Sequence, residues 1–217
     1  MSNIKLVHSG GNSGSLTTPT SNPSSNITFK LPQSDGTAGQ VLMTDGNGNL
    51  SWVTPATTNG ITMAQQWRVT ADFTVSAGSD STIASNWESA DTHGPGAIGS
   101  NLTESSGVFS FPSTGIYRIY AQTTYNSVSG ANYRTELKMQ VQTASDNNWQ
   151  LATSQGQSLS SPAEQTGSIS MEYLFDVTNT SSCIFKLLVR SHENSIKFHG
   201  ASDKTETGIT VIRLGDT

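Results

Sequence analysis

The segment GVFSFPSTGIYRIYAQTTY, residues 107–125, decides the fold class. Beyond Gly115 apolar and more polar side chains alternate. One side carries Tyr117, Ile119 and Ala121, and the other carries Arg118, Tyr120 and Gln122. This period of two is typical of a β-strand with one buried face, because successive side chains point to opposite faces. Pro112 and Gly115 indicate a turn just before the strand, since Pro fixes φ and Gly adopts turn conformations that other residues cannot.

The same alternation recurs on both sides of this segment, and turn signals separate the runs. The further predicted strands are 67–75, 107–111, 135–143, 170–177, 184–191 and 208–214. No window shows the 3.6-residue apolar stripe of an amphipathic helix. Seven or eight short strands at this spacing predict an all-β fold, an antiparallel jelly-roll sandwich.

The apolar pattern also divides the chain. Apolar residues are sparse before about Val41 and regular only from Trp67 onward. We therefore predict an extended N-terminal arm (1–30), a β-hairpin neck (31–58) and a jelly-roll head (62–217). The arm has too few apolar residues for a core of its own, so it is either flexible or ordered by docking on something else.

The neck sequence GQVLMTDGNGNLSW, residues 39–52, predicts a hairpin. Its TDGNGN stretch offers oxygen ligands at Asp45, Asn47 and Asn49, as a calcium loop does at its start. The later ligands are missing, because Leu50 stands where the loop needs Gly and Ala56 where it needs Glu. Asp-Gly and Asn-Gly are strong hairpin-turn signals, so a turn is favoured over a calcium site.

Charge and composition restrict the partners. Only 12% of residues are charged, against roughly 25% in ordinary soluble domains, and the net charge is -5. The 11 Lys and Arg residues are scattered, so no basic stripe exists for nucleic acid. Neither a signal peptide nor a membrane-spanning run is visible. Cys183 lies in an apolar run and is expected to be buried.

Catalytic, cofactor and metal motifs have no support in the sequence, so we predict a protein that is not an enzyme. GPGAIG, residues 94–99, matches GxGxxG but has no following helix, and we expect an exposed loop. The four His residues lie far apart without ligand-type partners, and no nucleophile elbow or carboxylate pair in an apolar context is present.

GVFSFPSTGIYRIYAQTTY resembles a segment of the complement and tumour-necrosis-factor jelly-roll superfamily. The residues that carry the resemblance are Phe109, Phe111, Pro112, Gly115, Ile116 and Tyr117. The likeness extends over about 65–214, with WRVTADFTV similar to the first strand of that family and TGITVIRL to its last. It departs at FDVTNTSSCIFKLLV, where the family usually has a short Gly-Asp turn. The resemblance implies a compact homotrimer.

A second resemblance covers residues 4–53. IKLVHSGGNSGSLTTPTSNPSSNITFKLP and SDGTAGQVLMTDGNGNLSWV are similar to modules of structural and fibre proteins of tailed bacteriophages, particularly those of marine cyanobacteria. The resemblance implies a protein of the virion surface, assembled in the host cytoplasm, whose arm binds other virion proteins. Three necks around an axis would bury Val41, Met43, Leu50 and Trp52, which a lone hairpin leaves without a partner.

Two functions follow from these resemblances. In the first, the protein is a trimeric fibre or spike whose knob contacts a host-surface glycan or outer-membrane protein, through the loop residues Asn147, Asn148 and Trp149. Trp149 has an alternative, which is to begin a strand and pack inward. In the second, the protein is a head fibre, collar or capsid-decoration protein without receptor recognition. A bacterial adhesion protein and a depolymerase are further alternatives.

Overall fold

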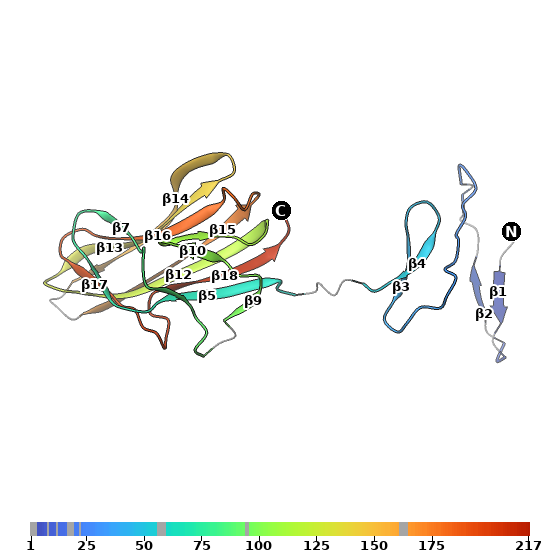
Figure 1. Ribbon diagram of the computed structural model, residues 1–217, viewed down its shortest axis with the longest axis horizontal. Coiled ribbons are helices and arrows are strands. Elements are labelled where there is room, and N and C mark those ends of the chain that lie inside the picture. The colour runs from blue at the N-terminus through green and yellow to red at the C-terminus, as the bar shows by residue number, and fades with distance from the viewer. Residues whose placement is uncertain are drawn as a thin grey trace. The chain divides into compact units, whose positions relative to one another are not determined.

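The computed structural model describes residues 4–7, 9–11, 13–16, 20–21, 23–55, 60–93, 96–160 and 165–217. The chain forms two units, residues 1–57 and 58–217. All regular elements in the described residues are β-strands (Figure 1), which confirms the all-β prediction. No helix that could span a membrane is found in this part of the chain.

The first unit contains two hairpins. Strand β1 (Ile4–Val7) pairs with β2 (Ser13–Leu16), and β3 (Val41–Thr44) pairs with β4 (Leu50–Val53), both antiparallel. The arm was predicted to be extended, and this is wrong for the part of it that forms the β1–β2 hairpin. Its polar sequence hid the hairpin, because short strands with little apolar alternation give no periodic signal.

The turn between β3 and β4 is closed by one carboxylate. Oδ1 of Asp45 accepts hydrogen bonds from the backbone N–H groups of Asn47 (2.8 Å) and Asn49 (3.1 Å), and Oδ2 accepts one from the Asn49 amide (2.6 Å). These bonds, led by that of the Asn49 side chain, lower the pKa of Asp45. Asp45 therefore stabilises a turn, as predicted, although the loop is longer than a two-residue hairpin turn.

The second unit, the knob, contains two antiparallel sheets with the core between them (Figure 1). The first sheet has the order β10-β11-β16-β13-β14, with β7 on β16. The second has the order β6-β17-β12-β18-β5-β8, with β15 on β12 and β9 on β5. The strands are β5 (Met63–Val69), β6 (Phe73–Val75), β7 (Asp80–Thr82), β8 (Trp87–Ser89), β9 (Ala97–Gly99), β10 (Thr103–Ser105), β11 (Val108–Ser110), β12 (Gly115–Ser127), β13 (Asn132–Thr143), β14 (Asp146–Leu159), β15 (Thr166–Val177), β16 (Ile184–Ser191), β17 (Ile196–Phe198) and β18 (Gly208–Gly215).

The core begins in the segment that decides the fold. The inward side of β12 is fully buried, as its alternation predicted, and carries Tyr117, Ile119, Ala121, Thr123 and Tyr125. Phe111 contacts Tyr117 (ring centroids 4.6 Å apart) on one sheet and Phe185 (5.5 Å) on the other, so it joins the two layers. Cys183 is buried in the same core, which confirms its role as an apolar side chain.

Gly115 has a steric reason to be glycine. Its φ is +141°, and a Cβ at this position would lie 2.5 Å from the carbonyl oxygen of Gly215 on the neighbouring strand β18. A side chain would force β12 and β18 apart just where both sheets are joined by Phe111.

Three predicted boundaries differ from the structure. The expected strand 67–75 is divided at residues 70–72, because β5 stays on β18 whereas β6 pairs with β17. The expected loop at 94–99 contains β9, which pairs with β5, while residues 94–95 lie outside the described part. Strand β14 was predicted only as the alternative for Trp149, since its residues are mostly polar and exposed.

The knob has a proximal end, where the chain enters β5, and an opposite distal end. Thr62 lies beside the last strand at the proximal end, with its hydroxyl 3.4 Å from Nη1 of Arg213. At the distal end β12 finishes against β17, where Ser127 pairs with Ile196. These two ends decide which loops are free to meet a partner.

Candidate functional site

The outward side of the second sheet is a candidate assembly face. On strands β15, β12, β18 and β5 the side chains opposite to the core are mostly uncharged. The apolar ones are Ile116, Tyr120, Leu174, Ile212, Leu214 and Ala64. Leu174 is 59% exposed and Leu214 57% exposed, so the chain alone leaves this face in water.

The charges at the centre of this face neutralise each other. Arg118 on β12 donates to Oε2 of Glu172 on β15 through Nε (3.0 Å) and Nη2 (2.6 Å). Beside this pair lies a shallow hollow of about 230 Å³, lined by Arg118, Tyr120, Thr210 and Ile212. Arg68, paired with Glu88 (3.1 Å), and the exposed Asp176 lie toward the margins of this face among Ser, Thr and Gln residues. An apolar centre with a polar rim is the composition of a protein–protein interface.

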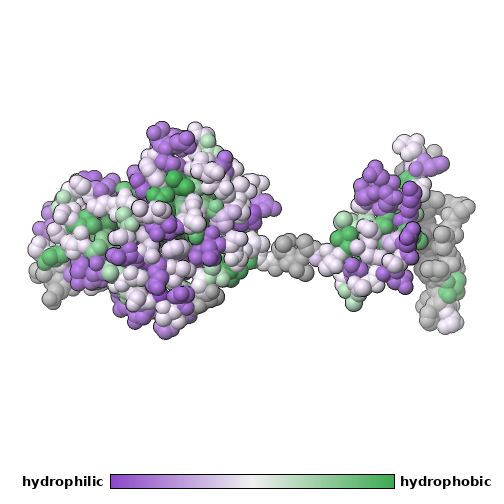
Figure 2. Space-filling view, in the orientation of Figure 1, coloured by the Kyte–Doolittle hydropathy of each residue, from purple (hydrophilic) through white to green (hydrophobic). Residues whose placement is uncertain are grey.

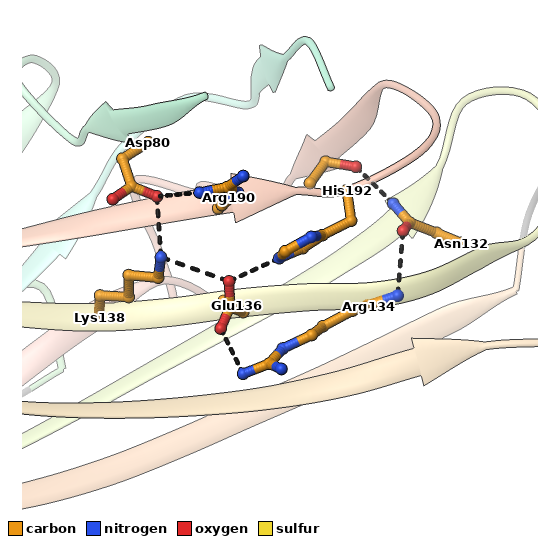
Figure 3. Close-up of polar contacts among 8 residues, drawn as sticks. Asp80, Asn132, Arg134, Glu136, Lys138, Arg190 and His192 are labelled. Atoms are coloured by element: carbon orange, nitrogen blue, oxygen red, sulfur yellow. Dashed lines mark hydrogen bonds and ion pairs between the residues drawn. The ribbon is translucent and has the colours of Figure 1, made fainter. Parts of the chain in front are cut away.

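The outward side of the first sheet is different, because it carries a charged cluster (Figure 3). Glu136 lies at its centre on β13, and the titratable side chains around it come from β13, β7, β16 and the residue that follows β16. They are Arg134, Lys138, Arg190, His192 and Asp80. The strand register explains why these side chains lie close together, since Glu136 lies opposite Arg190, and Arg190 lies opposite Asp80.

Glu136 is nearly buried and has three basic neighbours. Its Oε2 lies 2.7 Å from Nε2 of His192 and 3.3 Å from Nζ of Lys138, and its Oε1 lies 2.6 Å from Nη2 of Arg134. Burial by itself would raise the pKa of this carboxyl, but the His192 hydrogen bond and the charges of Lys138 and Arg134 outweigh it and lower the pKa. Glu136 is therefore ionised at neutral pH and suited to holding β13 and β16 together, not to proton transfer.

Lys138 continues the cluster to a third strand. Its Nζ lies 2.9 Å from Oδ1 of Asp80, which is also 3.7 Å from Nη1 of Arg190. The carboxylates of Glu136 and Asp80 are thus both occupied by cations of the same chain. The cluster therefore stabilises the pairing of β7, β16 and β13.

A group of potential metal ligands lies near the distal end, among the described residues. Asp72, His199 and Glu206 place one donor atom each within 4.8 Å of one another. Lys197 lies 3.2 Å from Asp72, and Lys204 lies 2.9 Å from Glu206. Because each carboxylate already has a lysine partner, the group is accounted for as ion pairs.

The residues that were predicted to contact a host lie at the start of strand β14. Asn147 and Asn148 are exposed, and Trp149 is half-buried beneath Lys186, whose Nζ lies 4.2 Å from the ring centre. The alternative for Trp149 is therefore correct in that it belongs to a strand, although it lies on the outward side of the sheet.

These three residues are also at the proximal end of the knob. In the first sheet the end of β13 pairs with the start of β16, where Val141 lies opposite Phe185. Phe111 contacts both Phe185 and Tyr117, and Tyr117 lies at the start of β12, which is at the proximal end. The turn into β14 is consequently on the side where the chain enters. The loops at the distal end include 128–131 and 192–195, which are joined by hydrogen bonds from Val128 N to Ser195 O (3.0 Å) and from Asn194 Nδ2 to Ala131 O (2.5 Å). In the sequence these loops were marked only by turn residues.

The four residues predicted to form the trimeric neck occupy two faces of the hairpin. Val41 lies opposite Val53, and Leu42 lies opposite Trp52, so Val41 and Met43 point away from Leu50 and Trp52. The expectation that Trp52 has no local partner is wrong. Its Nε1 donates to the Ser34 carbonyl (3.0 Å), and its ring covers Gly36, where a Cβ would lie 2.6 Å from it.

Solved structures confirm the fold of the knob. Eiger, a tumour necrosis factor from S. frugiperda, has a TM-score of 0.52 and 17% identity, covering 73% of this chain and 96% of its own. Murine APRIL at pH 5.0 has a TM-score of 0.50 and 12% identity, covering 70% of this chain and 98% of its own. The knob is thus a tumour-necrosis-factor-like jelly roll.

A third structure, the PRD1 vertex protein P5, has 16% identity over 72% of this chain and all of its own, but its TM-score of 0.41 is too low to carry an argument. No protein-family model matches the chain, and no curated protein matches it in sequence.

Proposed function

We propose that this chain is a non-catalytic structural protein of a tailed-phage virion, a homotrimeric fibre or spike. Its knobs join through the outward side of β15, β12, β18 and β5, and its N-terminal arm binds other virion proteins. The distal loops are then the part of the trimer that is free to meet a host-surface glycan or outer-membrane protein. The virion assignment is supported by the sequence resemblance of residues 4–53.

The proposed trimer is supported by the difference in charge between the outward sides of the two sheets. The second sheet offers an apolar centre in which Arg118 pairs with Glu172, so these two charges need no external partner. The first sheet carries cations, among them Arg134, Lys138 and Arg190. Interface centres are depleted in charged residues, so burial of the second sheet costs less. A closed threefold arrangement covers this face in every copy and leaves none of it exposed to further association.

A matched pair of leucine variants tests this arrangement. Leu174 on β15 and Leu151 on β14 are similarly exposed, at 59% and 56%, but they belong to opposite sheets. We expect Leu174→Asp to change the molar mass measured by light scattering at micromolar concentration from trimer to monomer. Leu151→Asp should stay trimeric. A monomeric wild type, or equal behaviour of the two variants, would contradict the proposal.

Position on the particle needs a separate experiment. Labelling of virions with an antibody to the knob should give signal at the tail if the protein is a tail fibre. Signal on the head shell or collar would instead assign it the purely structural role.

A further inference from the structure

The register divides the neck hairpin into two faces, and each carries three apolar side chains. Residues that lie opposite each other in an antiparallel pair point to the same side, so Leu42, Thr44, Leu50 and Trp52 share one face. Val41, Met43, Ser51 and Val53 share the other. The two sides are therefore defined by the register alone.

A third segment extends both faces. Lys30 pairs in parallel with Asn49, through hydrogen bonds from Lys30 N to Gly48 O (2.8 Å) and from Leu50 N to Lys30 O (2.9 Å). Because side chains alternate along an extended chain, Lys30 lies on the side of Asn49, and Leu31 lies on the side of Leu50. We call Leu31, Leu42, Leu50 and Trp52 the apolar neck face. It contains no charged residue, whereas the opposite face includes Lys30.

The apolar neck face is only partly covered by its own chain. Leu31 is 74% exposed, Leu42 42% and Trp52 39%, although Trp52 packs on Gly36. Among the described residues, every buried apolar side chain of the core lies at Met63 or beyond. The described part of the first unit thus forms a regular hairpin without a buried core, and such a hairpin is marginal in water.

We infer that the apolar neck face packs against the same face of two further copies of this chain, so that the core of the neck is intermolecular. The inference rests on the proposed trimer. Residues 54–62 connect β4 to β5, and nine residues reach at most about 30 Å. Three necks tied to one trimer of knobs are therefore held at high effective concentration. An uncharged face needs an apolar partner, and two identical faces supply it.

The register provides a matched test in the full-length chain. Leu42 and Met43 are neighbours on β3, and in a single chain their exposures are similar, at 42% and 51%. They point to opposite faces, so a difference in reactivity between cysteines at these positions reports burial by another copy. The natural Cys183 is buried and contributes little background.

We expect the thiol of Leu42→Cys to react with a water-soluble maleimide at least about ten-fold more slowly than that of Met43→Cys, after normalisation to the rates in urea. Leu31→Cys is the second variant, because Leu31 is the most exposed member of the face and its replacement leaves the contacts of Trp52 intact. It should be protected as well.

Light scattering on the same samples distinguishes failure of the intermolecular neck core from failure of the proposed trimer. A trimer in which Leu42→Cys and Leu31→Cys react as fast as Met43→Cys would overturn the intermolecular neck core and leave the trimer of knobs standing. A trimer in which Met43→Cys is the protected variant would show that the opposite face is buried, and this result would also overturn the inference. A monomer would overturn the proposed function itself.

Discussion

Replacing Glu136 by Gln tests the charged cluster on the first sheet. The substitution keeps the size of a side chain that is 7% exposed but removes the charge that faces His192, Lys138 and Arg134. The Arg134 side chain is half-exposed, so solvent screens its interaction and it contributes little. His192 and Lys138 are the partners that count, at 2.7 Å and 3.3 Å.

A hydrogen bond to a charged group contributes about 1.5–3 kcal/mol. Lys138 keeps Asp80 as a partner after the substitution, so its charge is not stranded. We therefore expect Glu136→Gln to lower the free energy of unfolding by about 2 kcal/mol. For a domain of this size this corresponds to a Tm lower by about 4–8 °C.

The pH dependence gives a second readout. The pKa of Glu136 is lower in the folded protein than in the unfolded chain, so its contribution is complete above the unfolded pKa of about 4.3. It disappears as pH falls through the folded pKa. The other titratable groups around Glu136, namely Arg134, Lys138, Arg190, His192 and Asp80, are present in both proteins, so the comparison isolates the carboxyl.

Urea unfolding at fixed protein concentration, at pH 7 and at pH 3, provides the measurement, since association would otherwise shift the midpoint. Asp203→Asn, at an exposed carboxylate, is the control and should change stability by less than about 0.5 kcal/mol. The reasoning is refuted if Glu136→Gln unfolds like the wild type at pH 7, or if the difference between them is the same at pH 3.

Two further predictions concern the buried side of β12. The Tyr125 hydroxyl faces Thr135 without a hydrogen bond of acceptable geometry, and burial raises its pKa to about 12. Because a raised pKa gives stability that is lost as pH rises above about 10, Tyr125→Phe should be at least as stable as the wild type at pH 7 and lose less in alkaline urea unfolding. Gly167→Ala should destabilise by about 1–3 kcal/mol in the same assay, because its Cβ would lie 2.7 Å from the Tyr125 ring. A neutral Gly167→Ala variant would mean that β15 can move away from β12.

The sequence predicted the strands that have one clearly buried side. The expected strand 115–125 coincides with most of β12, because buried residues alternate strictly along it. The expected strand 184–191 coincides with β16, which is a short apolar run bounded by turn residues. Strand β14 could not be predicted from alternation, because it is an edge strand in which most side chains are exposed and polar. Its pairing with β13 therefore produces no apolar periodicity in the sequence. The break at residues 70–72 could not be predicted for another reason. The alternation of β6 continues that of β5, but β6 pairs with β17.

The candidate sites depend on register, and register is not visible in a single strand. Glu136 and Lys138 alternate with apolar residues in the predicted strand 135–143, but Asp80 reaches this strand only because β7 and β13 flank β16 on its two sides. The neck shows the same limit at close range. Val41, Met43, Leu50 and Trp52 were grouped as apolar residues of one hairpin, and a loop of five residues decides which of them share a face.

In the proposed trimer, the stretch from Leu31 to Trp52 has a more specific role than a hairpin with unpaired side chains. Trp52 is held by Ser34 and Gly36 of its own chain, which fixes the ring against one face of the hairpin instead of leaving it free. A prepositioned apolar side chain loses little conformational freedom when a partner covers it. If the neck were an inert spacer, nothing would require a tryptophan anchored beside exposed leucines. A threefold core gives this anchoring a purpose, because each Trp52 would then meet its neighbours without having to be ordered first.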